Sequence, residues 1–295
     1  MFDAPDPPPV VVEAPRQADA ITVTAPTVQI RERAREFLGE VMPSPEMGQF
    51  ARWTSPVCVG VMGLQPDMEA RVRQRVEAVA RDAGAMVAEA PCRSNLVIAF
   101  AANGQSFVQA MLRRRSRLLM QLEPREVKDI RDVRRPVVWW RATAPSDGDG
   151  VAAGTESAAV MGSSGEGGSP LSSMMPTVTT TSGFNSTLIG TNLSLSVTHA
   201  FAVVDVGLAE GKPLDAVVDY VAMVTLAPVR HPAEPSAAPS ILNLFAPDGP
   251  QELTRWDKAL ISAAMKFRLD RPARTQRTAI RNGIVEELAT EEGEK

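Results

Sequence analysis

Residues that carry chemistry are scarce in this chain of 295 residues. It has two histidines, His199 and His231, one tyrosine, Tyr220, and two cysteines, Cys58 and Cys92. So few imidazoles and thiols exclude the usual zinc-binding patterns of histidine and cysteine. A Gly-x-Ser-x-Gly elbow, a His-Glu-x-x-His helix and a complete Walker loop are missing as well. We therefore expect no catalytic residue, no cofactor and no metal site from any intact motif.

Long apolar runs and a surplus of positive charge are also missing. No stretch approaches the roughly 18 uncharged apolar residues of a membrane helix, so we expect no integral membrane segment. The net charge is −4, which argues against nucleic acid as a partner because such binding neutralises phosphates with Lys and Arg. The first residues, Met1 to Asp6, resemble no signal peptide. Two locations follow: the cytoplasm, or an exported compartment such as the periplasm after removal of a leader.

Composition divides the chain into segments. Residues 1–45 are predicted to form a flexible Pro-rich tether followed by a short helix, because proline fixes φ and removes a backbone donor. Residues 46–289 are predicted to form a single α/β domain. Within it, residues 145–190 consist mainly of Gly, Ser, Thr and other small residues. This stretch is predicted to be a flexible insertion loop, since it offers little apolar surface to bury. Residues 290–295 form an acidic tail.

Strand and helix patterns alternate within the domain. The β-branched run Pro56–Gly63 predicts a strand, a helix with an apolar stripe runs from Pro66 to Gly84, and Asn95–Phe100 predicts a buried strand. Val137–Ala142 predicts a further strand, in which Trp139 and Trp140 alternate, so that one should face the core and the other outward. Val197–Val206 follows the insertion and should pair with the strand Val137–Ala142 in the same sheet.

The C-terminal part is predicted to be mainly helical. The segment Pro213–Ala227 is apolar around most of its surface, which is typical of a buried helix. Thr254 and Asp257 resemble a capping box at the start of the next helix. Ile280 and Leu288 belong to a last amphipathic helix. The predicted fold class is α/β (α+β), a mixed sheet with packed helices.

The two cysteines lie at matching points of the strand–helix–strand unit. Cys58 stands at the start of its first strand and Cys92 just before its second. If the two strands are neighbours, the sulfurs can meet and form a disulfide, which indicates an oxidising compartment. The alternative is a pair of buried reduced cysteines that act as small apolar residues.

Two polar features of the second half have functional and structural interpretations. Gly207–Lys212 lies between a strand and a helix, where a phosphate-binding loop would stand. However, its glycines are separated by three residues and Pro213 replaces the metal-binding hydroxyl, so a plain turn explains it better than a nucleotide site.

Asp215 and Asp219 are four residues apart and share one helix face. They could bind a hard cation or perform acid–base chemistry. They could equally form a solvated face.

Four short segments carry a family resemblance: Arg52–Cys58, Pro91–Leu96, Val218–Met223 and Ser240–Asn243. In this order they resemble uncharacterised proteobacterial envelope proteins related to zincin metalloproteases. The resemblance covers roughly residues 50–270, and it implies a zincin-like fold.

In an active zincin, the buried helix carries His-Glu-x-x-His, in which both imidazoles bind zinc and the glutamate is the general base. The matching stretch here has Asp219 and Met223 at the metal-binding positions and Tyr220 at the position of the base. Ser240–Asn243 would take the place of the turn beneath a metzincin metal. The resemblance therefore implies a degenerate zincin helix, in which the fold is kept and the zinc chemistry is lost.

The leading hypothesis is a non-catalytic cell-envelope protein whose pseudo-metalloprotease domain binds a protein partner. The alternative is a hydrolase with an unrecognised polar site around His199, Asp205, Asp215 and Asp219. A screen for bound metal or for hydrolytic activity separates the two.

Overall fold

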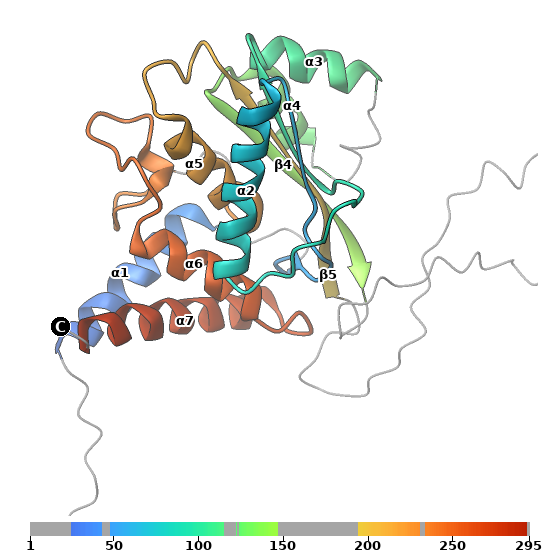
Figure 1. Ribbon diagram of the computed structural model, residues 1–295. Helices are drawn as coiled ribbons and strands as arrows, with labels where there is room; N and C mark the ends of the chain where they lie inside the picture. Colours follow the sequence, from blue (N-terminus) through green and yellow to red (C-terminus); the bar gives the residue numbers. More distant parts are fainter. Residues whose placement is uncertain are drawn as a thin grey trace, which may run out of the picture.

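The computed structural model of this chain has a mixed α/β fold (Figure 1). It describes residues 25–42, 48–114, 122, 124–146, 194–230 and 234–293. Nearly all of the predicted insertion loop and most of the predicted tether lie outside the described residues. The strands are β1 (Arg52–Trp53), β2 (Val59–Met62), β3 (Leu96–Ala101), β4 (Val137–Ser146) and β5 (Ser194–Asp205). The helices are α1 (Ala25–Val41), α2 (Pro66–Asp82), α3 (Gly104–Arg114), α4 (Pro124–Asp132), α5 (Leu214–Leu226), the 3-10 helix η3 (Ile241–Asn243), α6 (Arg255–Lys266) and α7 (Ala273–Gly293).

The long strand β5 organises the sheet. It pairs in parallel with β3, from Leu96 opposite Ala200 to Ala101 opposite Asp205, and β2 pairs in parallel with β3. The short β1 also pairs in parallel with β5, whereas β4 runs antiparallel along nearly the whole of β5. The predicted pairing of the strands on either side of the insertion is therefore confirmed, and the fold class is the predicted α/β class.

The unit β2-α2-β3 forms as its sequence indicates. Pro66 opens α2, and acidic Asp67 lies in its first turn, where the helix dipole favours negative charge. The stripe of Val72 and Val76 is buried, and Gly84 follows the helix with a φ of 84°. This left-handed conformation suits glycine and ends the helix.

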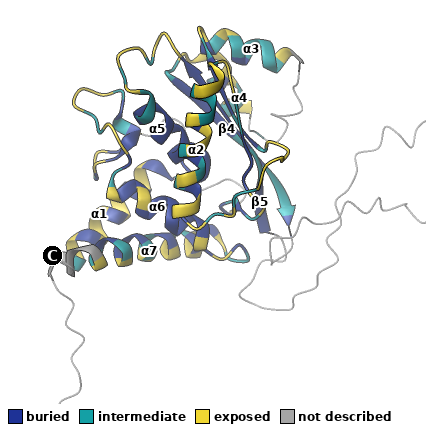
Figure 2. Cartoon of the chain, in the orientation of Figure 1, coloured by how far each residue is buried: buried dark blue, intermediate teal, exposed yellow. Residues whose placement is uncertain are grey.

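The main core fills one face of the sheet, where α2, α5 and α6 pack (Figure 1). The central helix α5 is buried from Ala216 to Leu226, and in Figure 2 it is almost entirely the colour of buried residues. Its uniform apolarity predicted this burial. The capping box of Thr254 and Asp257 at the start of α6 is also present.

Both ends of the described chain belong to this core. α1 begins at Ala25, and its residues Ala34, Phe37 and Leu38 are buried within residues 1–45, the segment predicted to be a tether with a short helix. The Phe37 ring meets Trp256 of α6 edge-on at 5.9 Å. At the other end, α7 continues to Gly293, so residues 290–293 of the predicted acidic tail extend a helix. α1 and α7 pack side by side.

A second, smaller core lies on the opposite face of the sheet, under α3 and α4. Trp140 stacks on Phe201 there with ring centroids 5.1 Å apart, whereas Trp139 meets Tyr220 of α5 on the first face. The two tryptophans therefore point to opposite faces of the sheet, but the prediction that one of them faces outward is wrong, because each face carries its own core and both side chains are buried. Among the described helices, none is long and apolar enough to cross a membrane.

Candidate functional site

Asp219 lies on the buried helix α5, at the first metal-binding position that the zincin resemblance implies. Its side chain is 1% exposed. Arg75 of α2 donates two hydrogen bonds to its carboxylate, at 2.6 and 2.7 Å, and the backbone N–H of Leu253 donates a third at 3.0 Å. The hydrogen bond to Asp219 is the largest of the effects that raise the pKa of Arg75. Asp219 therefore joins α2, α5 and the segment before α6, and its oxygens are occupied by donors.

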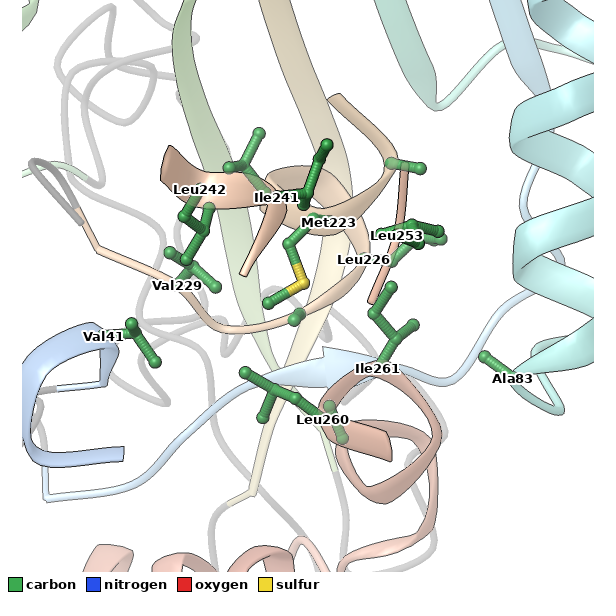
Figure 3. Close-up of a cluster of buried hydrophobic side chains, with 14 of the residues drawn as sticks. Val41, Ala83, Met223, Leu226, Val229, Ile241, Leu242, Leu253, Leu260 and Ile261 are labelled. Atoms are coloured by element: carbon green, nitrogen blue, oxygen red, sulfur yellow. The ribbon is translucent and has the colours of Figure 1, made fainter. Parts of the chain in front are cut away.

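Met223, at the second implied metal-binding position, lies in an apolar environment. Figure 3 shows its sulfur and methyl group among carbon side chains from several elements of the main core. The labelled residues include Leu226 of α5, Val229 after it, Ile241 of η3 and Leu260 of α6. Such a site stabilises a thioether by packing and offers no nitrogen or oxygen ligand for a metal.

Tyr220 stands where the resemblance places the general base. Its ring packs edge-on against Trp139 at 5.9 Å and against Phe245 at 5.3 Å. Burial raises the pKa of the Tyr220 phenol well above its usual range, because the phenolate would lose its hydration. The phenol therefore stays neutral at physiological pH.

The turn around Ser240–Asn243 packs against α5 as η3. The Ser240 hydroxyl and the Ile241 N–H both donate to the Asp257 carboxylate, and Thr254 donates to it from its N–H at 2.9 Å. Burial raises the pKa of Asp257, against the opposing effect of these hydrogen bonds. This network fastens the turn to the start of α6, so Ser240–Asn243 is held in place against α5.

Asp215 and Asp219 share one face of α5, and both face α2. Arg71 binds Asp215 with a shortest distance of 2.6 Å, one turn before the pair of Arg75 and Asp219. The sequence analysis missed both arginine partners. The sequence contains one indication of this pairing, because Arg71 and Arg75 have the same four-residue spacing on α2 as the aspartates on α5.

Asp205 ends β5 and is fully buried. It accepts hydrogen bonds from the backbone N–H groups of Gly104 at 3.0 Å and Leu208 at 3.1 Å, and from Nε of Arg134 at 3.3 Å. Burial acts to raise the pKa of Asp205, but these donors outweigh it, so the pKa is lowered. A Cβ on Gly104 would lie 3.0 Å from the Asp205 Cβ, a contact so tight that Asp205 would have to shift slightly to admit a side chain there.

In the loop Gly207–Lys212, backbone N–H groups near the start of the loop already donate hydrogen bonds to another part of the protein. The N–H groups of Leu208 and Ala209 both bond to Asp205, through its carboxylate and its carbonyl oxygen respectively. A phosphate group there would compete with a buried carboxylate for the same donors. The geometry favours the turn interpretation over the nucleotide site.

His199 lies on the other side of the sheet from α5. It is half-buried, and its ring stacks on Phe201 with centroids 6.2 Å apart. Phe201 belongs to the core under α3 and α4, whereas Asp215 and Asp219 lie on the first face with α2. The structure therefore leaves His199, Asp205 and the α5 carboxylates in three separate places, each with its own contacts.

The predicted disulfide between Cys58 and Cys92 is present, with Cα atoms 6.1 Å apart. Cys58 directly precedes β2, and Cys92 lies shortly before β3, its parallel neighbour. Asn95 supports the same corner, because its side chain accepts from the Cys58 N–H at 2.8 Å and donates to the Pro56 carbonyl at 2.9 Å. The disulfide thus links the starts of two neighbouring strands.

Within the described ranges, no group of three or more His, Cys, Asp or Glu side chains could hold a metal ion. No family model, no curated protein sequence and no solved structure matches this chain. The described residues form a mixed α/β protein with one disulfide.

Proposed function

We propose that this chain is a non-catalytic module of the cell envelope that binds another protein on a pseudo-metalloprotease domain. The helix that would carry the zinc site holds Asp219 in a buried ion pair and Met223 in an apolar cluster. Both side chains stabilise the domain where a zincin would hold its metal, and this supports a structural use of α5.

The disulfide supports an exported location, with the periplasm as the compartment. Cys58 and Cys92 are the only cysteines in the sequence, and both are used in the bond. Such bonds persist in oxidising compartments and are rare in the cytosol, where thiols are kept reduced.

A group of exposed apolar side chains at one end of the sheet supports binding to another protein. Met62 ends β2 and is 48% exposed, Val206 and Leu208 follow β5, and Val133 precedes β4. Since β4 runs antiparallel to β5, these points belong to the same end of the sheet. A contiguous exposed apolar patch marks a contact site for another protein, and we propose that these four side chains form such a site. We call these four residues the sheet-end surface.

Site-specific photo-crosslinking tests this proposal. A photoreactive residue at Leu208 of the sheet-end surface should give one discrete adduct with another exported protein in cells that naturally express the chain. The matched control is Val28 of α1, which is 53% exposed and lies outside the sheet-end surface. It should give no such adduct, and the double substitution Met62→Ser and Val206→Ser should abolish crosslinking from position 208. Equal adducts from both positions, or none from 208, would contradict the proposal.

A further inference from the structure

Four arginines line a cavity of about 290 Å³ between α1 and α7. Arg35 belongs to α1, and Arg274, Arg277 and Arg281 belong to α7, where their spacing of three and four residues places them on one face. Leu38 provides an apolar wall. Figure 1 shows the two helices side by side at the edge of the molecule farthest from α3. The cavity is therefore separate from α5 and from the sheet-end surface.

The positive charge in this cavity is only partly balanced. Glu32 binds Arg35 with a shortest distance of 2.6 Å. No carboxylate of the described residues lies within ion-pair distance of Arg274, Arg277 or Arg281. Asp270, shortly before α7, is bonded to Arg268 instead. Among the described residues, these three guanidinium groups thus have no ion-paired carboxylate, and Glu32 acts on Arg281 only as a nearby charge.

Two of these arginines are also partly removed from water. The Arg277 guanidinium lies over the Phe50 ring at 5.7 Å and donates to the Met42 carbonyl. Desolvation lowers the pKa of Arg277, and no acidic group offsets that effect. Nε of Arg281 is buried and has no hydrogen-bond partner. A buried donor without an acceptor is unfavourable, and an anionic ligand would supply one.

The position of the arginines on α7 adds a second unfavourable interaction. Arg274 and Arg277 lie at the N-terminal end of the helix, whose first turn contains no acidic residue. The helix dipole favours anions at that end and disfavours cations. Arginines that gather at the positive end of a helix, beside an unsatisfied Nε, form a site that a bound anion would stabilise.

We propose that this arginine-lined cavity is a binding site for a phosphate group carried by a small molecule or a lipid headgroup. Guanidinium groups match phosphate oxygens in paired hydrogen bonds, so several of them around one cavity select phosphate strongly. The cavity is larger than a phosphate needs, which leaves room for a compact organic part against Leu38.

Binding assays with the full chain at constant ionic strength test this proposal. Glycerol 3-phosphate should bind in isothermal titration calorimetry and raise the melting temperature, and the double variant Arg274→Gln, Arg281→Gln should weaken binding at least tenfold. Arg277 is left intact because it also contacts Met42 and Phe50. The matched control is Arg33→Gln on α1, an exposed arginine outside the cavity lining, which should bind like the wild type.

Vesicles distinguish the two sources of phosphate. If the ligand is a lipid headgroup, vesicles with phosphatidylglycerol should bind the wild type but not the double variant, and vesicles of neutral lipid should bind neither. The proposal is overturned if neither glycerol 3-phosphate nor these vesicles bind. It is equally overturned if Arg33→Gln weakens binding as much as the double variant does.

Discussion

At the scale of single residues, α5 shows how the surroundings of a polar side chain limit what it can bind. The Asp219 oxygens accept hydrogen bonds from Arg75 and from the Leu253 N–H. Met223 is fully buried among apolar neighbours. A zinc ion at this point would need at least three protein ligands with accessible lone pairs. These two side chains provide none that is free.

We therefore expect purified protein to contain no stoichiometric zinc. The physical reason is that the thioether of Met223 and the ion-paired carboxylate of Asp219 cannot replace two imidazoles. Elemental analysis after incubation with zinc and dialysis measures this, with a chelator-treated sample as the control. One tightly held zinc per chain would revive the hydrolase hypothesis and contradict the non-catalytic proposal.

At the scale of elements, α2 and α5 are joined by two ion pairs of different burial. Both helices follow parallel strands, and Arg71 and Arg75 meet Asp215 and Asp219 in the same order along the chain. The Asp219 side chain is 1% exposed, whereas that of Asp215 is 37% exposed. The carboxylate of one ion pair thus lies in the interior, and the carboxylate of the other lies near the surface.

The two pairs predict different effects on stability. Asp219→Ala should lower the free energy of unfolding by about 3 kcal/mol, because it leaves Arg75 and the Leu253 N–H without their buried acceptor. Asp215→Ala is the matched control, and it should cost less than about 1 kcal/mol because water screens an exposed pair. Urea unfolding followed by tryptophan fluorescence measures both. Equal losses would show that burial does not separate the two pairs.

At the scale of the whole molecule, the sheet interleaves the two halves of the chain. β5 comes from the second half and lies between β3 and β4, which both come from the first half. The main core likewise combines α1 and α2 with α5, α6 and α7. Neither half can complete the sheet by itself.

Cleavage between the halves should therefore leave them associated. A specific protease site inserted within residues 147–193 should yield two fragments that elute together in size exclusion chromatography, because their shared sheet does not depend on continuity of the chain. The same chain without the inserted site is the control for protease specificity. Fragments that elute separately would mean that residues 48–146 and 194–293 form two domains.

Several local features could be predicted from the sequence because they depend on neighbouring residues. The Pro66 start of α2, the capping box of Thr254 and Asp257, and the buried α5 are all present. The disulfide between Cys58 and Cys92 followed from their matching positions before two strands. The packing of α1 has no such local signal, because the partners of its apolar residues lie in α6 and α7, far along the chain.

The sequence by itself determined the α/β class, the strand–helix–strand unit and the absence of an intact catalytic motif, since periodicity, capping and motif spacing are local properties. Only the tertiary structure decided which charged groups meet. It paired Asp219 with Arg75, 144 residues away, and placed His199 on the opposite face of the sheet. It also brought Arg35 beside three arginines of α7. Contacts between distant segments depend on how the elements pack, so a matching spacing such as that of Arg71 and Arg75 can suggest a pairing but does not fix the partner.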